Sequence, residues 1–240
     1  MNISNNKILI TGGASGIGLG LTERFLEEGN SVIVCGRRAD VLDDLRERYP
    51  AVVTRRCDLT DEADRAALYE WIASEHADLD VLVNNAGIQN WMDVADEDFF
   101  ARAQTELATN VEAPLHLTAL FLKLPALRTI VNVTSGLSFV PLTKAPVYSA
   151  TKAFFHSFTV SLRHLLENRG VEVVEIIPPA INTDLGGKGL HDHAPPVADF
   201  VAAVFDQLKA GKTDITFGLS EAMANAGPNE AKEIFRRLNT

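Results

Sequence analysis

Cysteine is scarce in this chain of 240 residues, where only Cys35 and Cys57 occur. Each ends a β-rich run, SVIVC or AVVTRRC, and two cysteines cannot supply the disulfide framework typical of small secreted domains. We expect both to be buried free thiols. Long apolar runs are missing as well, because glycines interrupt the chain directly after KILIT. The sequence therefore predicts neither a secretory signal nor a membrane span, and we expect a cytoplasmic protein.

Positive charge is in the minority: 22 Lys and Arg residues stand against 32 Asp and Glu residues, for a formal net charge of -10. Like charges are not gathered into blocks of about five or six. Such a chain has no general affinity for polyanions, so nucleic acid and anionic membrane surfaces are disfavoured as partners. Internal repeats, low-complexity tracts and interdomain linkers are absent. Since 46% of the residues are hydrophobic, enough for one substantial core, we expect a single domain over residues 1–240.

The chain does contain a regular alternation of short β-branched runs with longer helical patterns. KILIT precedes SGIGLGLTERFLEEG, SVIVCG precedes ADVLDDLRERY, and DLDVLVNN precedes a helix-like stretch that continues to about residue 123. Strands separated by helices form βαβ units, and the apolar runs LDVLV and TIVNV suit strands buried on both faces. The sequence thus predicts an α/β fold, a Rossmann-type doubly wound sheet of about seven mostly parallel strands with helices on both faces.

One segment, residues 183–196 (TDLGGKGLHDHAPP), has little chance of continuous regular structure because it holds three glycines and two prolines. We expect it to be a lid over the substrate. After it, VADFVAAVFDQLKAG predicts a helix, DITFG a last strand, and the final twenty residues a helix or a partly ordered tail. His191 and His193 do not predict a metal site, because no third and fourth ligands of suitable spacing are visible.

The first predicted strand leads through TGGASGIG, residues 11–18, directly into an amphipathic helix. Glycines at such a turn permit a tight bend and a close approach of the backbone to a pyrophosphate, and the N–H groups at the helix start face the anion. A glycine pattern alone is weak evidence, but the strand before it and the helix after it supply the context that the motif requires. We expect the nucleotide to be bound by Gly12, Ser15, Gly16, Ile17 and Gly18.

The choice of nucleotide is made at the end of the second strand, in VIVCGRR. An acidic residue there would accept hydrogen bonds from the adenosine ribose. Gly36 offers no carboxylate that would repel a 2′-phosphate, and Arg37 offers a planar fork of donors matched to one. The alternative is that Arg37 and Arg38 are solvated charges at the start of the next helix. We expect NADP(H) as the preferred cofactor, with NAD(H) possible.

Three further motifs follow in order: NNAG at residues 84–87, NVTS at 132–135, and a tyrosine and a lysine four positions apart in PVYSATKAFF. Together with TGxxxGxG they resemble the short-chain dehydrogenase/reductase family over about residues 7–184. VLVNNAGIQ, VTSGLSF and PVYSATKA also look like the bacterial DltE-like oxidoreductases within that family. The resemblance implies an oxidoreductase that transfers a hydride between a nicotinamide cofactor and a carbonyl or alcohol substrate.

The resemblance also implies a catalytic tetrad of Asn110, Ser135, Tyr148 and Lys152. Tyr148 would give its proton to a carbonyl oxygen and Ser135, thirteen residues upstream, would hold that oxygen. Lys152 would lower the pKa of the tyrosine and bind the nicotinamide ribose, and Asn110 would anchor a water that relays protons. Bringing a phenol from pKa 10 to near 7 requires roughly 4 kcal/mol of preferential stabilisation of the phenolate. A nearby lysine ammonium together with the positive nicotinamide ring of a cofactor could supply much of it in a partly desolvated site.

Each member of the tetrad has a plainer interpretation when it is taken singly. Tyr148 could be a packing residue at a helix start, Lys152 a solvated charge, Ser135 a cap at a strand end, and Asn110 a turn former. The ordered set favours the catalytic interpretation over these.

The same resemblance assigns further cofactor contacts. Asp58 is expected near the adenine, although it could also cap the following helix. Asn84 is expected near the adenosine ribose and ring edge. Thr183 is expected near the carboxamide or phosphates. Two positions depart from the family pattern: Pro179 replaces a glycine, and Ser15 replaces a basic residue found in many NADP enzymes. The remaining contacts expected from the motifs are Ala86, Gly87 and Pro178.

Segments that follow the tetrad elements are expected to border the substrate. Trp91, Leu137 and Phe139 would form an apolar wall that favours aryl or alkyl ketones and aldehydes, unless they simply fill gaps in the core. The helix of Tyr148 carries more apolar residues than one face can hide, which favours a homodimer or homotetramer. These residues are Phe154, Phe155, Phe158, Val160, Leu162 and Leu165. Two other functions stay open, a lyase or epimerase that keeps its nicotinamide and an NADP-sensing binding protein.

Overall fold

Seven strands form one sheet in the computed structural model, which describes residues 1–240. The strand order is β3-β2-β1-β4-β5-β6-β7, and every neighbouring pair is parallel. The strands are β1 (Lys7–Thr11), β2 (Ser31–Gly36), β3 (Val53–Arg56), β4 (Val81–Asn84), β5 (Thr129–Val133), β6 (Glu172–Ile177) and β7 (Asp214–Thr216). The predicted doubly wound sheet is confirmed. Its order reverses between β1 and β4, the point at which such sheets bind ligands.

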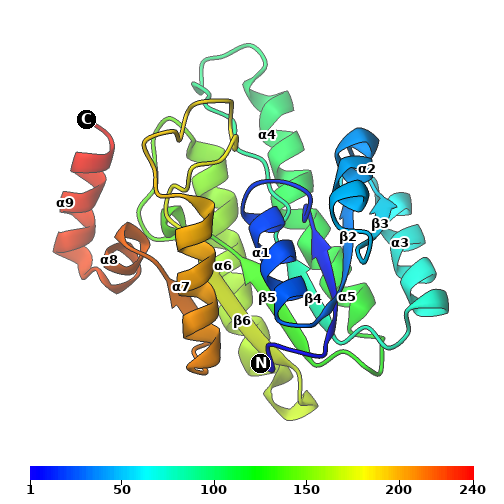
Figure 1. Cartoon of the computed structure of the whole chain (residues 1–240). Helices are drawn as coiled ribbons and strands as arrows, with labels where there is room; N and C mark the ends of the chain where they lie inside the picture. The colour runs from blue at the N-terminus through cyan, green and yellow to red at the C-terminus, as the bar shows by residue number, and fades with distance from the viewer.

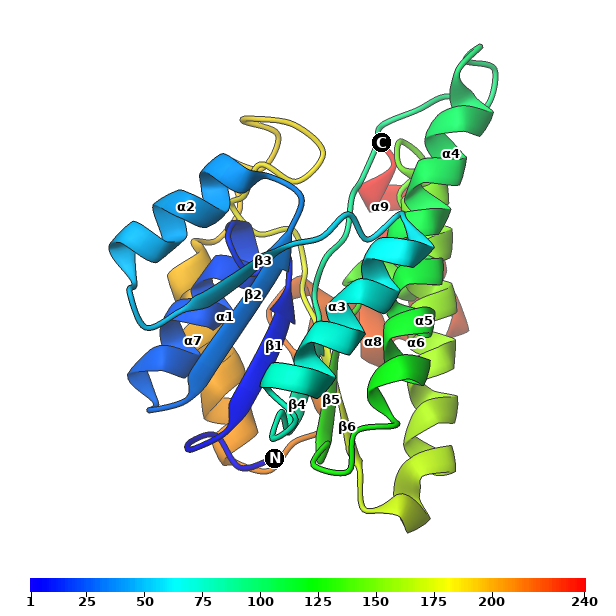
Figure 2. The same cartoon turned by 90° about the vertical axis from the view of Figure 1, so that its right-hand side faces the viewer.

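Helices cover both faces of the sheet, as Figure 1 and Figure 2 show. Helices α1, α2 and α7 lie on one face, and α3, α4, α5 and α6 lie on the other. Their bounds are α1 (Gly16–Glu27), α2 (Ala39–Arg48), α3 (Glu62–Glu75), α4 (Phe99–Leu107), α5 (Ala113–Phe121), α6 (Pro146–Leu166), α7 (Val197–Lys209), α8 (Leu219–Asn225) and α9 (Pro228–Leu238). Two 3-10 turns, η2 (Gly136–Ser138) and η3 (Glu167–Arg169), lie on either side of α6. None of these helices is long and apolar enough to cross a membrane.

The central strands are buried on both faces, because successive side chains of a strand point to opposite sides. Ile8 and Ile10 of β1 pack into the cluster that contains Phe205 of α7. Leu9, between them, packs into the opposite cluster with Phe121 of α5. All five side chains are fully buried. The sheet therefore separates two apolar cores and holds the carboxyl ends of its strands in fixed positions.

The helical stretch predicted to continue to about residue 123 is interrupted by a π-helical turn, η1 (Ala108–Glu112). Asn110 lies in this turn, and its side chain bonds to the backbone of Ile88 in both directions. Its Nδ2 donates to the Ile88 carbonyl oxygen at 2.8 Å, and its Oδ1 accepts from the Ile88 N–H at 2.9 Å. Single π-helical turns occur often at functional sites. The interruption ties the helix to the loop that follows β4.

Residues 183–196 contain no helix and no strand, so the prediction of an irregular segment is confirmed. Gly186, Gly187 and Gly189 there have positive φ values of 81°, 148° and 81°, which side chains other than glycine rarely adopt. The last twenty residues lie almost entirely in α8, which begins at Leu219, and α9, which ends at Leu238. Cys35 and Cys57 are both buried and free.

Candidate active site

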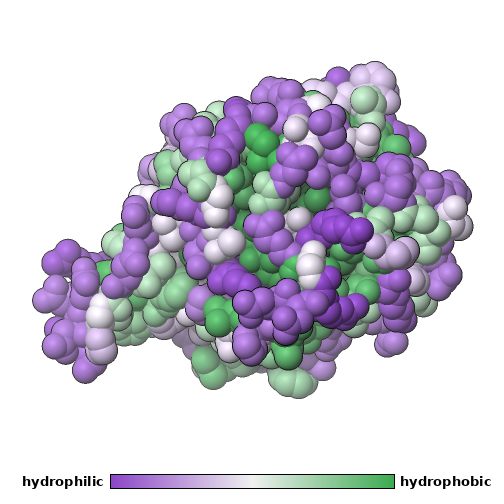
Figure 3. Space-filling model, turned by 90° about the horizontal axis from the view of Figure 1, so that it is seen from below, coloured by the Kyte–Doolittle hydropathy of each residue, from purple (hydrophilic) through white to green (hydrophobic).

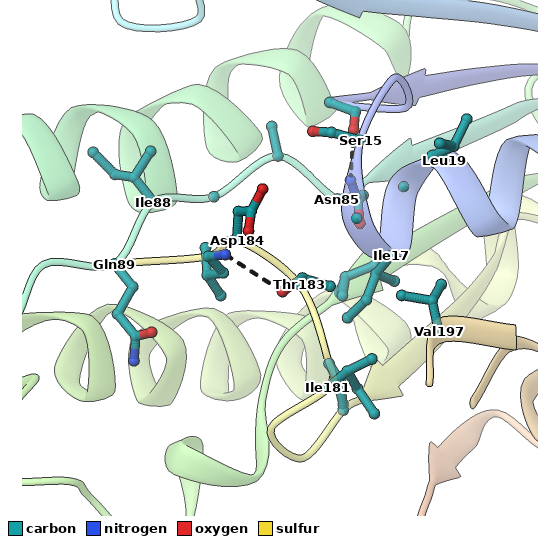
Figure 4. A pocket seen from close by; sticks show the side chains of 18 of the residues that line it. Ser15, Ile17, Leu19, Asn85, Ile88, Gln89, Ile181, Thr183, Asp184 and Val197 are labelled. Carbon is teal, nitrogen blue, oxygen red and sulfur yellow. Dashed lines mark hydrogen bonds between the residues drawn. The ribbon is translucent and has the colours of Figure 1, made fainter. Parts of the chain in front are cut away.

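One large pocket, of about 1410 Å³, opens at the carboxyl ends of the strands. Its wall includes the glycine turn after β1, the ends of β2 and β5, the loops after β4 and β6, and the start of α6. Figure 4 shows part of it, with Ser15 and Leu19 at one end and Ile88 and Gln89 at the other. Thr183 and Asp184 lie between these ends. The pocket thus has a glycine-turn end and a second end near the loop that follows β4.

The glycine turn leaves the backbone uncovered. Gly12 and Gly16 have positive φ values of 65° and 53°, and α1 begins at Gly16. A Cβ atom on Gly18 would overlap the carbonyl oxygen of Gly12, and one on Gly12 would lie 3.2 Å from the Cα of Ala86. The first N–H groups of a helix lack acceptors within the helix, and here they border the pocket together with Ile17. The turn therefore fits a pyrophosphate group.

Two arginines border the pocket at the end of β2. Arg37 and Arg38 are both exposed there. The Nη2 of Arg38 donates a 3.1 Å hydrogen bond to Ser15 Oγ on the glycine turn. Burial raises the pKa of Asp58, but hydrogen bonds from Thr60 and the charges of Arg37 and Arg56 outweigh this and hold it below its ordinary value. This part of the pocket carries the positive charge that a phosphorylated ribose needs.

Three of the four predicted tetrad residues lie in the pocket wall, and the fourth, Asn110, lies behind it. Ser135, Tyr148 and Lys152 line the pocket, and all four are buried. Ser135 Oγ accepts a 3.1 Å hydrogen bond from the N–H of Leu137. Asn110 lies behind the wall: a Cβ atom on Gly87 would lie 3.4 Å from its Oδ1 and 3.5 Å from the Nζ of Lys152. The absence of a side chain at Gly87 therefore leaves room between the pocket and both groups.

The expected lowering of the Tyr148 pKa relies on Lys152 together with the positive nicotinamide ring of a cofactor, and the protein chain alone does not produce it. Burial raises the Tyr148 pKa, the hydrogen bond with Ser135 lowers it in part, and the charge of Glu106 raises it further. The Lys152 ammonium lies 5.7 Å from the tyrosine ring centre and donates instead to the Val133 carbonyl oxygen. Burial also lowers the pKa of Lys152 to about 8. Desolvation is therefore the largest effect on both groups, and Tyr148 holds its proton at neutral pH.

Other predicted cofactor contacts line the same pocket, namely Asp58, Ala86, Gly87, Pro178 and Thr183. Thr183 reaches the glycine turn: a Cβ atom on Gly16 would lie 3.3 Å from its Cγ2. Pro179, which stands where the family has glycine, also lines the pocket. The Pro178 carbonyl oxygen accepts a 2.9 Å hydrogen bond from the N–H of Gly136, so the end of β6 is tied to the turn after Ser135.

Asn84 does not lie in the pocket, contrary to its expected place near the adenosine ribose. Its Nδ2 donates to Asn132 Oδ1 at 3.0 Å and to Thr118 Oγ1 at 3.3 Å, toward α5. Asn85 lines the pocket instead, and its Nδ2 donates to the Thr11 carbonyl oxygen at 2.9 Å. The reason is the alternation of side chains along a strand, which sends these neighbours to opposite faces.

Two of the three predicted substrate contacts also lie elsewhere. Trp91 is 40% exposed outside the main pocket, with the Lys144 ammonium 5.2 Å above its ring. Phe139 packs on His156 with ring centres 4.5 Å apart, and His156 Nδ1 lies 2.9 Å from Glu175 Oε1. Only Leu137 lines the pocket. The rings of Trp91 and Phe139 pack against side chains outside the pocket. The apolar part of the pocket wall is therefore smaller than the sequence predicts.

The C-terminal helix contributes to the pocket wall, which no pattern in the sequence predicts. Leu238 lines the pocket, although α9 has no fully buried residue. Asn239 holds this end of the helix to the loop before α6: its Oδ1 accepts from the Thr143 N–H at 2.6 Å, and its Nδ2 donates to the Pro141 carbonyl oxygen at 3.1 Å. The α8 and α9 region projects from the body of the molecule, with hydrophilic residues outermost (Figure 3).

Histidines of the irregular segment do not form a metal centre. No group of three or more His, Cys, Asp or Glu side chains is placed to hold a metal ion. His191 lines the pocket, and burial lowers its pKa while a hydrogen bond at Leu185 partly offsets this effect. His191 is therefore a neutral polar group in the pocket wall at neutral pH.

Comparisons with known proteins agree with this geometry. The sequence model of the family described as short chain dehydrogenase matches residues 6–193. The chain belongs to the short-chain dehydrogenase/reductase family and is an NAD(P)-dependent oxidoreductase of that family that acts on small molecules.

Three similar proteins illustrate the relationship. An oxidoreductase of Bacillus subtilis named DltE, described as uncharacterized, is 43% identical over 251 aligned positions that cover 100% of this chain and 99% of that protein. An NADP-dependent 3-hydroxy acid dehydrogenase, YdfG, of Escherichia coli is 33% identical over 182 positions, or 71% of each chain. The crystal structure of a short chain dehydrogenase from Burkholderia cenocepacia in complex with NADP superposes with a TM-score of 0.85 at 28% identity and covers 100% of both chains.

Proposed function

We propose that this protein is an NADP(H)-dependent carbonyl reductase, or an alcohol dehydrogenase in the reverse direction. The observation that carries the proposal is the position of Tyr148. Its phenol is buried, protonated and beside Ser135, in the same pocket as a glycine turn that fits a pyrophosphate. A proton donor beside a nicotinamide site is what reduction of a carbonyl group requires.

The residues of the chain have separate roles in this reaction. Bound NADPH supplies the hydride. Tyr148 gives its proton to the substrate oxygen, and the Ser135 hydroxyl holds that oxygen in line. Lys152 is fixed to the end of β5 by its hydrogen bond to Val133. Its ammonium stabilises the phenolate that forms on Tyr148. The same ammonium binds the nicotinamide ribose. Asn110, held in the π-helical turn, anchors the water from which the proton is replaced.

Two observations support NADP(H) as the preferred nicotinamide cofactor. Arg37 and Arg38 border the pocket at the end of β2, and Gly36 between strand and helix brings no carboxylate there. The similar dehydrogenase YdfG is named as NADP-dependent, and the similar Burkholderia cenocepacia structure holds NADP. A doubly charged phosphate is bound most strongly by arginine, whose fork donates two parallel hydrogen bonds.

A homo-oligomer built on α4 and α6 is part of the proposal. Large apolar side chains on these two helices remain exposed in the single chain, among them Phe100 and Leu165 at 69% each. The others are Leu107, Phe154 and Val160. Exposed apolar groups on two neighbouring helices are typical of a surface that a second copy covers.

A panel of ketones and aldehydes, assayed with NADPH and with NADH, tests the proposal. Net oxidation of the reduced cofactor with one or more carbonyl compounds is expected, and it should be faster with NADPH at low cofactor concentration. A lyase or epimerase would convert its substrate without net oxidation of the cofactor, and a cofactor sensor would bind NADPH without turnover. Either outcome would contradict the proposed reaction.

A further inference from the structure

Glu175 of β6 is a completely buried carboxylate, with a side chain that is 0% exposed. Thr134 Oγ1 donates to Glu175 Oε1 at 2.6 Å. His156 Nδ1 lies 2.9 Å from Oε1 and 3.0 Å from Oε2 of the same carboxylate. The hydrogen bond with Glu175 raises the pKa of His156, although burial opposes this effect. The three side chains therefore form one network in which a histidine compensates the buried negative charge.

The two partners of Glu175 come from the elements that carry the candidate catalytic residues. Thr134 follows the last residue of β5 and directly precedes Ser135. His156 lies in α6, two turns after Tyr148. Figure 1 shows β6 beside both β5 and α6. Glu175 thus connects the strand end that presents the serine with the helix that presents the tyrosine.

The backbone at Ser135 is held on both sides by this part of the fold. The N–H of Thr134 donates to the Ile176 carbonyl oxygen at 2.9 Å, so the residue before the serine is fixed through its backbone as well as its side chain. Phe139, four residues after the serine, packs on the ring of His156 with ring centres 4.5 Å apart. A shift of the network would therefore move the serine.

Stability alone gives little reason for an ionised group at this position. Taking two charges out of water costs about as much free energy as their attraction returns, and apolar residues of similar volume are often equally stable. Val173 and Ile177, which share the face of Glu175 on β6, are apolar and buried. Hydrogen bonds to a carboxylate differ from apolar contacts in that they fix direction and distance. The network is therefore suited to hold a precise geometry.

We propose that Glu175 is a positioning residue for the reduction, and that through Thr134 it sets the place of the Ser135 hydroxyl relative to the Tyr148 phenol. The proposal rests on the proposed function, in which these two groups meet the same substrate oxygen. A displacement of about 1 Å in such a pair slows a reaction by up to about a hundred-fold. Glu175 and His156 do not line the pocket, so they act through the residues that do.

Breaking the network at two places, with and without the serine hydroxyl, tests the proposal. Thr134→Val removes one hydroxyl at similar volume, and His156→Leu removes the contact on α6. Each substitution is made in the wild type and in Ser135→Ala. Thr134→Ser keeps the hydroxyl, and Thr129→Val, a buried threonine at the opposite end of β5, is the matched control. The measurements are the single-turnover rate of hydride transfer to the best ketone of the panel and NADPH binding by fluorescence.

The expected result is a rate loss of about ten-fold in Thr134→Val and in His156→Leu that shrinks to less than about two-fold in the Ser135→Ala background. Thr134→Ser and Thr129→Val should keep the wild-type rate, and NADPH affinity should stay the same in all of them. A network that only supports the fold would slow both backgrounds by the same factor. Equal losses in both backgrounds, no loss, or a loss explained by weaker NADPH binding would overturn the proposal.

The two substitutions lie in different elements, so one that fails to fold leaves the other to decide. Absence of NADPH oxidation by the wild type with every carbonyl compound of the panel would instead overturn the proposed function, and this proposal with it.

Discussion

The Nζ atom of Lys152 donates a 2.8 Å hydrogen bond to the carbonyl oxygen of Val133, the last residue of β5. This bond joins the helix that carries Tyr148 to the strand that leads into Ser135, so it fixes two parts of the candidate site relative to each other. The lysine is 4% exposed, and none of the ion pairs of the chain involves it. A buried cation without a carboxylate partner is kept at a cost in stability.

Lys152→Met is expected to stabilise the protein at neutral pH while it abolishes reduction. Burial lowers the Lys152 pKa from 10.5 to about 8, which corresponds to an upper limit of roughly 3 kcal/mol against the charged form. The pKa of Lys152 is lower in the folded protein than in the unfolded chain, so the unfolded chain binds more protons between about pH 8 and 10.5. The stability of the wild type should therefore rise with pH over this range. Urea unfolding across this range should show the rise in the wild type and in Lys144→Met, an exposed control, but not in Lys152→Met. A less stable Lys152→Met would contradict the assignment of burial as the dominant effect.

Glu106→Gln is expected to shift the pH dependence of reduction to lower pH. The amide keeps an acceptor for Asn90 but removes the charge that raises the Tyr148 pKa. Burial raises the pKa of Glu106 in the folded protein. The contribution of this group to stability is therefore complete below its pKa in the unfolded chain, and it is lost as pH rises through its pKa in the folded protein. The variant should therefore also be more stable at neutral pH.

The measurements are kcat against pH and urea unfolding at neutral pH, with the exposed Glu112→Gln as the control. An unchanged pH profile together with unchanged stability would show that the Glu106 carboxyl carries no charge near Tyr148. A lower stability would show that its hydrogen bonds to Asn90 outweigh its burial.

Arg37→Leu is expected to weaken NADPH binding far more than NADH binding. A charge-assisted pair with a phosphate is worth about 1.5–3 kcal/mol, or roughly ten- to hundred-fold in affinity. Arg38→Leu should act in the same direction, since its side chain reaches Ser15 on the glycine turn. Fluorescence titration with both cofactors checks this, and Arg46→Leu on the exposed face of α2 is the control. Equal losses for NADPH and NADH would remove the 2′-phosphate assignment.

Motif and periodicity were sufficient for the fold and for the glycine turn, because both depend on local sequence. The turn from β1 into α1 needs positive φ values at Gly12 and Gly16, and only glycine adopts them at no cost. The convergence of Ser135, Tyr148 and Lys152 followed from a resemblance, since their spacing alone leaves each with a plainer interpretation.

Side-chain direction and long-range contacts could not be predicted in the same way. Asn84 and Asn85 are neighbours in one motif, yet only Asn85 lines the pocket. Successive side chains at the end of β4 point to opposite faces of the sheet. Phe139 follows the pocket residue Leu137 by two positions, but it packs on His156 of α6. Leu238 reaches the pocket from the far end of the chain. No local pattern contains that information.

Asn239→Ala is expected to raise KM for the carbonyl substrate with little effect on NADPH binding. The side chain holds α9 to residues 141 and 143 by two hydrogen bonds, and Leu238 beside it forms part of the wall. Loss of two hydrogen bonds between neutral groups costs about 1–3 kcal/mol, enough to release the end of the helix. Steady-state kinetics and NADPH titration check this against Asn225→Ala, an exposed asparagine of α8. A KM that stays the same would mean that α9 has no part in substrate binding.

The central claim is that the Tyr148 proton is the one transferred to the substrate, and Tyr148→Phe tests it most directly. The substitution removes one oxygen atom and keeps the buried ring, so the fold and the cofactor site should survive. The measurement is NADPH oxidation with the best carbonyl substrate, alongside NADPH binding by fluorescence. Loss of about a hundred-fold or more in kcat with NADPH affinity unchanged is predicted. Undiminished reduction by Tyr148→Phe would contradict the account.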